Sequence, residues 1–394
     1  MRPHTLAPQR RALTVAALLA AALMPLGLLA PPAHADIRPD QQWYLEAMKA
    51  PELWKVTKGE GVTVAVLDSG VNPIPGLEGR LLPGKSFTSD SPNPREDKDG
   101  HGTEMAALIA GSGAGNGLQG LAPAAKILPL RTTVGGGFFS DHDNLVEAIR
   151  YAARSDAKVI NISQVLTGVD NETRTELQDA INEANERGKL VFAGSGNDGR
   201  QVKYAYPAIL PGVVAVGAVD KTGTVADFSN YGPHLALTAP GDPGGTSVAT
   251  AIASASAALI WSKHPDWTNH QVLRVMVETT GRSERGEEPS MYLGHGVVRP
   301  GQVLIDGDGD PGPADKSPLF SKYFASLEAS KSPSPDAASK DAKNQEQPSA
   351  DSTESQAAQE DTGSGPPWTA IGIGAAALAA IAATTLLLTK RRRT

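Results

Sequence analysis

The sequence contains no cysteine among its 394 residues. This absence excludes disulfides, thiolate nucleophiles, zinc–cysteine sites and iron–sulfur clusters, and it removes redox chemistry as a guide to the compartment. The sequence also lacks a basic patch between residues 36 and 389, where acidic side chains outnumber basic ones. Such a region repels a phosphate backbone, so we expect no nucleic-acid partner.

The first 35 residues have the pattern of a secretory signal peptide. Arg10-Arg11 precedes an apolar run from Ala12 to Ala30, and Ala33-His34-Ala35 gives the small-x-small pattern that signal peptidase accepts. A retained membrane anchor is the alternative, although a proline and a glycine interrupt the apolar run. We therefore predict that residues 1–35 direct the chain out of the cytoplasm and are removed.

The carboxyl end predicts a single transmembrane helix at residues 368–389. Thr369 to Thr389 is an uncharged run of 21 residues, and as a helix it would span about 30 Å of hydrocarbon. Trp368 marks one boundary, and the basic tail 390–394 follows the other. Because basic residues favour the cytoplasmic side, we expect the body of the protein on the outer face of the cell membrane.

The stretch before this helix predicts a flexible tether. Residues 328–367 contain no aromatic or branched aliphatic side chain, so they cannot bury enough apolar surface to offset their chain entropy. The alternating acids of Asp306 to Asp310 suggest a calcium loop, but Pro311 and Ser317 depart from the EF-hand pattern, which favours a solvated linker. The complete prediction is a signal peptide (1–35), an arm packing on the body (36–60), a globular body (61–305), a disordered Pro/Ser/Ala-rich linker (306–367), a transmembrane helix (368–389) and a cytoplasmic tail (390–394).

The body alternates predicted strands and helices. The predicted strands are 62–67, 126–130, 158–162 and 189–193, and the predicted helices are 101–110, one beginning near Ser140 with Asp143 in a capping pattern, 172–187 and one ending near Lys263. This alternation predicts an α/β fold, with a mostly parallel sheet and helices on both faces. Active groups in such folds gather beyond the carboxyl ends of the strands.

Three polar residues far apart in the sequence have the chemistry of an activated nucleophile. Ser247 begins a helix, whose amino end favours developing negative charge, although a simple helix cap is the alternative. His101 lies between two glycines, which leave its ring accessible as a base, whereas a turn residue is the other interpretation. Asp68 ends a predicted strand and has the carboxylate needed to orient an imidazole.

In the order Asp68-Ser69-Gly70, His101-Gly102-Thr103 and Gly245-Thr246-Ser247, these motifs closely resemble those of the subtilisin-like serine proteases, or subtilases. The resemblance covers about residues 40–300. It implies a subtilisin-like three-layer fold and a serine endopeptidase in which Ser247 attacks the carbonyl, His101 transfers the proton and Asp68 orients the imidazole. This chemistry requires no cofactor or metal, and its partners are protein or peptide substrates.

The resemblance also implies a substrate site. Asn197, in Ser195-Gly196-Asn197, stands where a subtilase has its oxyanion donor, although a loop asparagine is the alternative. Ser163, Gln164 and Val165 resemble the strand edge that pairs with extended substrate. Gln164-Val165 departs from the Leu-Gly pair that subtilases more often have, which leaves the shape of the primary pocket open.

The whole layout resembles the mycosins, membrane-anchored proteases associated with type VII secretion. That resemblance implies a secretion complex as a partner. The connection before Ser247 is shorter than in most subtilases, and Ala251 stands where the family generally has proline. These departures keep an alternative open, in which a catalytically weak or inactive subtilase fold is a scaffold that stabilises a membrane secretion complex.

Overall fold

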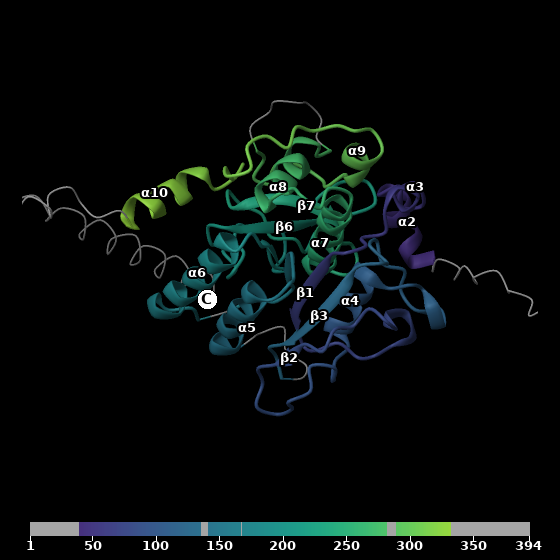
Figure 1. Ribbon diagram of the computed structural model, residues 1–394, viewed down its shortest axis with the longest axis horizontal. Coiled ribbons are helices and arrows are strands. Elements are labelled where there is room, and N and C mark those ends of the chain that lie inside the picture. The colour runs from purple at the N-terminus through teal and green to yellow at the C-terminus, as the bar shows by residue number, and fades with distance from the viewer. Residues whose placement is uncertain (1–38, 135–140, 167, 282–288, 332–394) are drawn as a thin grey trace, which may run out of the picture. The chain divides into compact units, whose positions relative to one another are not determined.

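Seven parallel strands form the centre of the fold (Figure 1). The computed structural model describes residues 39–134, 141–166, 168–281 and 289–331. The strands are β1 (Thr63–Asp68), β2 (Lys85–Ser86), β3 (Lys126–Arg131), β4 (Val159–Ile162), β5 (Leu190–Gly194), β6 (Val213–Val219) and β7 (Leu235–Pro240). They follow the order β2-β3-β1-β4-β5-β6-β7, and each pairing between neighbours is parallel.

Helices connect the strands and cover the sheet (Figure 1). They are α2 (Pro39–Ala47), α3 (Ala50–Val56), α4 (His101–Ala110), α5 (His142–Arg154), α6 (Asn171–Glu186), α7 (Thr246–Lys263), α8 (Asn269–Glu278), α9 (Pro300–Leu304) and α10 (Ser321–Lys331), with short 3₁₀ turns at Pro75–Leu77 and Ala114–Asn116. The α/β class and the helices on both faces are confirmed. The physical cause is that each parallel crossover passes over a face of the sheet.

The sheet separates two apolar cores because successive side chains of a strand point to opposite faces. In β1, Val64 and Val66 belong to the core beneath α4, α7 and α8, whereas Ala65 and Leu67 belong to the core beneath α5 and α6. All four side chains are fully buried. This double burial explains why the strand sequence is a continuous apolar run rather than an alternating one.

Helix α7 runs through the larger core, and 15 of its 18 residues are buried. Its alanine and serine side chains are small, so the helix lies close to the strands beneath it. The buried hydroxyls have acceptors: Ser254 donates to Asn161 Oδ1 at 3.0 Å, and Ser256 donates to the Ile252 carbonyl at 2.8 Å. The close packing fixes the amino end of α7, where Ser247 lies, against the carboxyl edge of the sheet.

Helices α2 and α3 pack on the same core. Leu45, Met48 and Leu53 are buried within it, and the Trp54 indole donates to the Leu121 carbonyl at 2.9 Å. The apolar residues of this segment therefore cover the body rather than solvent.

The predicted helix near Ser140 is confirmed as α5, but the predicted capping pattern was wrong. The helix begins at His142, and its N-cap is Asp141 rather than Ser140. The Asp141 carboxylate accepts from the Asp143 amide at 3.1 Å, which satisfies one of the donors left open at a helix start.

The expected boundary of the linker at residue 306 was also wrong, because the chain stays on the body up to residue 331. Gln271 donates to the Gly312 carbonyl at 3.0 Å and Arg274 to the Lys316 carbonyl at 2.6 Å, both from α8. Helix α10 follows, and its Tyr323 hydroxyl donates to Asn182 at 2.9 Å. The low-complexity composition starts only at residue 328, after the residues that make these contacts.

Within the four described ranges, no helix is long and apolar enough to cross a membrane. The predicted signal peptide at 1–35 and the predicted transmembrane helix at 368–389 lie outside the described residues.

Candidate active site

Asp68 is the last residue of β1, at the carboxyl edge of the sheet. Its backbone carbonyl accepts from the Thr132 amide at 2.8 Å, which ties it to the end of the neighbouring strand β3. Its carboxylate is almost fully buried, with 2% of the side chain exposed. A buried carboxylate is costly unless it is bonded, and Oδ1 accepts from the Ser69 amide at 2.8 Å.

His101 is the first residue of α4, and its Nδ1 lies 2.7 Å from Asp68 Oδ1. We call this pair the dyad. The imidazole is 19% exposed, so one part of the ring contacts the carboxylate while another reaches the surface. Gly102 makes this approach possible, because a Cβ at that position would lie 2.1 Å from the Gly70 carbonyl oxygen.

The surroundings of His101 raise its pKa above the ordinary value of 6.5. Burial alone would lower the pKa, but the charge of Asp68 and its hydrogen bond outweigh burial, with further contributions from Asp99 and Glu104. A base beside a carboxylate holds an accepted proton more strongly. The dyad can therefore accept a proton from a neighbouring hydroxyl and stabilise the imidazolium that results.

Ser247 is the second residue of α7 and is 6% exposed. Its hydroxyl donates to the Ser163 carbonyl at 3.4 Å, and the Ser163 hydroxyl donates to the Ser247 carbonyl at 3.3 Å. His101 bonds Asp68 at the end of β1, and Ser247 bonds Ser163 just after the neighbouring strand β4, so both residues lie at the carboxyl edge of the sheet. Their helices α4 and α7 pack against each other. Backbone N–H groups in a first helical turn have no acceptor within the helix, so they can donate to a ligand at the helix start.

Asn197 follows β5, and its Oδ1 accepts from the Thr246 amide at 2.9 Å. This bond fixes the orientation of the side chain. With the oxygen engaged, Nδ2 is the end that can donate to a ligand beside Ser247.

A cavity of about 590 Å³ opens beside Ser247. Its walls include Asn197 and the three residues of the predicted substrate strand, which are Ser163, Gln164 and Val165. Gln164, which departs from the family pattern, is buried, and its Oε1 accepts from the Thr132 hydroxyl at 2.7 Å. Thr132 directly follows β3, so the end of that strand holds the Gln164 side chain in place. The candidate nucleophile, the amide donor and the segment that follows β4 thus line one space.

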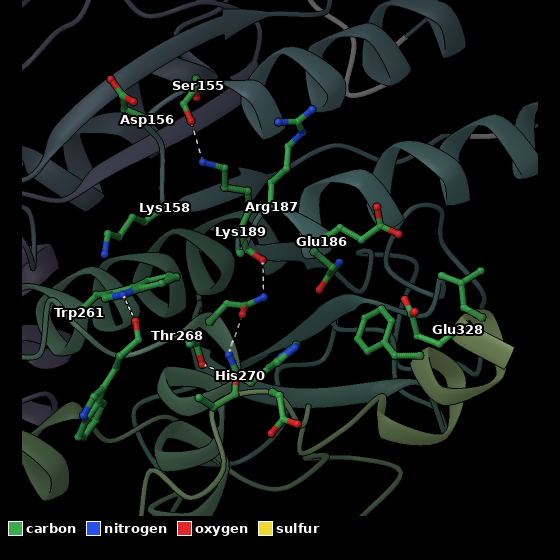
Figure 2. Close-up of a pocket in the computed structure, with 18 residues that line it drawn as sticks. Ser155, Asp156, Lys158, Glu186, Arg187, Lys189, Trp261, Thr268, His270 and Glu328 are labelled. Carbon is green, nitrogen blue, oxygen red and sulfur yellow. Dashed lines mark hydrogen bonds between the residues drawn. The ribbon is translucent and has the colours of Figure 1, made fainter. Parts of the chain in front are cut away.

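A larger cavity of about 780 Å³ lies at the opposite, amino edge of the sheet (Figure 2). Lys158 and Lys189 precede β4 and β5 there, and their ammonium groups donate to the carbonyls of Pro265 and Ser155. Burial lowers the pKa of both lysines. Both lysines thus bind backbone carbonyls of nearby segments, whereas the smaller cavity contains the candidate nucleophile Ser247 and the amide donor Asn197. We therefore take the smaller cavity as the candidate active site.

Sequence reasoning missed two charged residues beside the dyad. Asp97 is buried and accepts from Ser69 Oγ at 2.9 Å. Arg131 is fully buried, and its Nε donates to the Ser69 carbonyl at 3.1 Å. Its two terminal nitrogens donate to the two carboxylate oxygens of Asp90. These bonds, with hydrogen bonds from neighbouring side chains, hold the pKa of Asp90 far below its usual range. Asp90 and Asp97 lie in the acidic run 90–99, and one sequence gives no sign of which acids in it are buried.

Within the described ranges, no group of three or more histidine, aspartate or glutamate side chains is arranged to hold a metal ion. The groups at the site are instead those of acyl transfer: a hydroxyl at a helix start, an imidazole on a carboxylate, and an amide donor.

The Subtilase family model matches residues 59–296, which contain all of these groups. The chain belongs to the subtilase family. A thermostable alkaline protease of Halalkalibacterium halodurans is 36% identical over 62% of this chain and 68% of its own length. Subtilisin Savinase of Lederbergia lenta is 34% identical over 58% of this chain and 87% of its own. The subtilase described here is accordingly a serine-type endopeptidase that acts on protein substrates.

Solved structures give the same fold. The structure of MycP1, titled a serine protease and an essential component of the type VII (ESX-1) secretion system, matches with a TM-score of 0.59 and 31% identity. The match covers 70% of this subtilase and 90% of that chain. The subtilisin-like fold is therefore confirmed.

Proposed function

We propose that this subtilase cleaves peptide bonds with Ser247 as nucleophile, His101 as general base and then acid, and Asp68 as the carboxylate that orients the imidazole. The observation that carries the proposal is the 2.7 Å bond between His101 Nδ1 and Asp68 Oδ1. His101 lies on helix α4, which packs against α7, the helix that contains Ser247. This bond fixes the tautomer in which Nε2 accepts a proton.

Transfer of the Ser247 proton to His101 produces the attacking oxygen, and a tetrahedral intermediate forms on the substrate carbonyl carbon. Asn197 Nδ2 and the Ser247 backbone N–H donate to its oxyanion, because the Thr246 amide holds the other end of the Asn197 side chain. His101 then donates its proton to the leaving amine, which leaves an acyl-enzyme on Ser247. Water attacks that ester, with His101 again accepting a proton.

Ser163, Gln164 and Val165 bind the residues before the cut in our proposal. They line the cavity that contains Ser247, and Ser163 and Ser247 each donate to the carbonyl of the other. An extended peptide beside this segment places its scissile carbonyl near Ser247.

The test of the assignment is hydrolysis of a peptide library by the full-length protein and by Ser247→Ala. The wild type is expected to produce cleavage fragments, and Ser247→Ala is expected to lose at least about 1000-fold in kcat. Ser262→Ala in the same helix is the matched control and should retain activity. Equal activity in the wild type and Ser247→Ala would contradict the assignment.

We further propose that the protein is anchored in the cell membrane by residues 368–389 and works outside the cytoplasm. The absence of cysteine allows a sharp test, because a single introduced cysteine is the only thiol. In intact cells, a membrane-impermeant maleimide should label Ser352→Cys in the linker but not Thr394→Cys in the tail. The reverse pattern, or labelling of neither variant until the cells are lysed, would contradict the topology.

The likeness to MycP1 supports a last part of the proposal, that this subtilase acts with a type VII secretion system, as a mycosin does. Deletion of the gene should reduce export of that system's substrates, and the wild-type gene should restore it. Restoration by Ser247→Ala as well would favour a scaffold role, whereas normal export in the deletion strain would contradict the association.

A further inference from the structure

Asp97 lies between the two chain segments that carry the dyad, and only 6% of it is exposed. Its Oδ1 accepts from Ser69 Oγ at 2.9 Å and from the Gly100 amide at 2.9 Å. Its Oδ2 accepts from the Thr103 amide at 2.8 Å and from the Thr103 hydroxyl at 2.5 Å. One carboxylate therefore joins the residue that follows the dyad aspartate to residues on both sides of the dyad histidine.

Asp97 is itself held by Asn72. The Asp97 amide donates to Asn72 Oδ1 at 3.0 Å, and Asn72 Nδ2 donates to the Asp97 carbonyl at 2.8 Å. The Asn72 amide in turn donates to Thr103 Oγ1 at 2.9 Å. These bonds fix the carboxylate before any substrate arrives, so its contacts cost no reorganisation during the reaction.

The Ser69 hydroxyl lies between two carboxylates, 2.9 Å from Asp97 Oδ1 and 3.2 Å from Asp68 Oδ1. A hydroxyl has one proton and donates to one of them at a time. Because the distance to Asp97 is shorter, that proton goes to Asp97. Asp68 Oδ1 then remains available to His101.

We propose that Asp97 is a positioning residue of the reaction: it fixes the distance within the dyad and draws the Ser69 proton away from Asp68. The inference rests on the proposed roles of Asp68, His101 and Ser247. Without Asp97, the Ser69 hydroxyl turns to Asp68 Oδ1 and competes with the imidazole for that oxygen. His101 then holds an accepted proton less strongly.

Asp97→Asn tests the proposal. Each oxygen of Asp97 faces two donors, so either orientation of the amide sets an N–H against donors. We expect kcat to fall about 10- to 100-fold, KM to change little, and the acid limb of the kcat/KM profile to move to lower pH. Asp220→Asn is the matched control, since Asp220 accepts the same kinds of bonds from Thr222 and Thr224 in a turn after β6.

Titration of Ser247 with a fluorophosphonate gives the number of active sites, so that a misfolded fraction is not counted as lost turnover. In a Ser69→Ala background, Asp97→Asn should move the acid limb less, because the competing hydroxyl is gone. If Asp97→Asn does not fold, Ser69→Ala alone should lower kcat about 10-fold without moving the acid limb to lower pH.

Wild-type kcat per titrated site and an unmoved acid limb in Asp97→Asn would overturn the proposal, as would wild-type kcat in Ser69→Ala. Either result leaves Ser247 labelled, so it is distinct from failure of the proposed function, in which the wild-type protein itself is not labelled at Ser247.

Discussion

Gly102→Ala should strongly lower the activity of the enzyme, because a methyl group at this position has no space. The added Cβ would lie 2.1 Å from the Gly70 carbonyl oxygen and 2.9 Å from Asp68 Cβ, whereas ordinary carbon–oxygen contacts begin at about 3.3 Å. The start of α4 must therefore move by about 1 Å from the Asp68 segment. That shift would lengthen the 2.7 Å bond within the dyad beyond hydrogen-bonding distance.

A displacement of about 1 Å at reacting groups costs about 100-fold in rate. We expect kcat for a fluorogenic peptide to fall by that factor in Gly102→Ala, measured per folded molecule by circular dichroism and thermal melting. Gly301→Ala in α9 is the control, since the nearest atoms to its added Cβ lie at ordinary contact distances of 3.6 and 3.7 Å. Activity of Gly102→Ala within threefold of the wild type would refute the close-packing argument.

Three further predictions concern the dyad, the oxyanion donor and the amino-terminal helices. Asp68 raises the pKa of His101, and only the neutral imidazole is a base, so kcat/KM should fall tenfold per pH unit below a midpoint that lies above pH 6.5. Asp68→Asn should move that midpoint to lower pH, and an unmoved midpoint would count against the coupling between the two residues. Asn197→Ala should lower kcat by about 100- to 1000-fold, the range known for subtilisin, with KM little changed in steady-state assays; a change in KM alone would contradict oxyanion binding. Leu53→Ala should lower the free energy of unfolding by about 2–5 kcal/mol in urea titrations, because it leaves a cavity at a fully buried position of α3. A loss below about 1 kcal/mol would show that α3 contributes little to the core.

Sequence reasoning was most successful where one short motif determines local structure and chemistry together. The short, β-branched apolar run before Asp68 suggests a buried strand, and the end of a strand places its next polar residue at the edge of the sheet. His101 and Ser247 each stand at a helix start that the sequence already indicates. Three such motifs in family order were sufficient to predict the fold and the enzyme class.

The residues that support the dyad could not be predicted in this way. Asp97 lies in an acidic run where exposed and buried acids look alike, and only folding brings it to Ser69 and Thr103. Arg131 ends a strand, and its burial depends on Asp90, which lies 41 positions earlier. Long-range pairs of this kind leave no periodic or local signal in one sequence.

The end of the body was misjudged for the same reason. Residues 306–331 are rich in turn-forming and acidic residues at their start, which suggested a linker. Carbonyl groups in this stretch accept bonds from Gln271 and Arg274 on α8, and those acceptors are backbone atoms that composition cannot reveal.

The most direct test of the catalytic assignment is the labelling of full-length protein with a fluorophosphonate, followed by peptide mapping in a mass spectrometer. The wild type should acquire one adduct per molecule, on the peptide that contains Ser247, and prior alkylation of His101 by a chloromethyl ketone peptide should prevent it. A folded protein that gains no adduct, or gains it on a different serine, would contradict the role of Ser247 as the nucleophile.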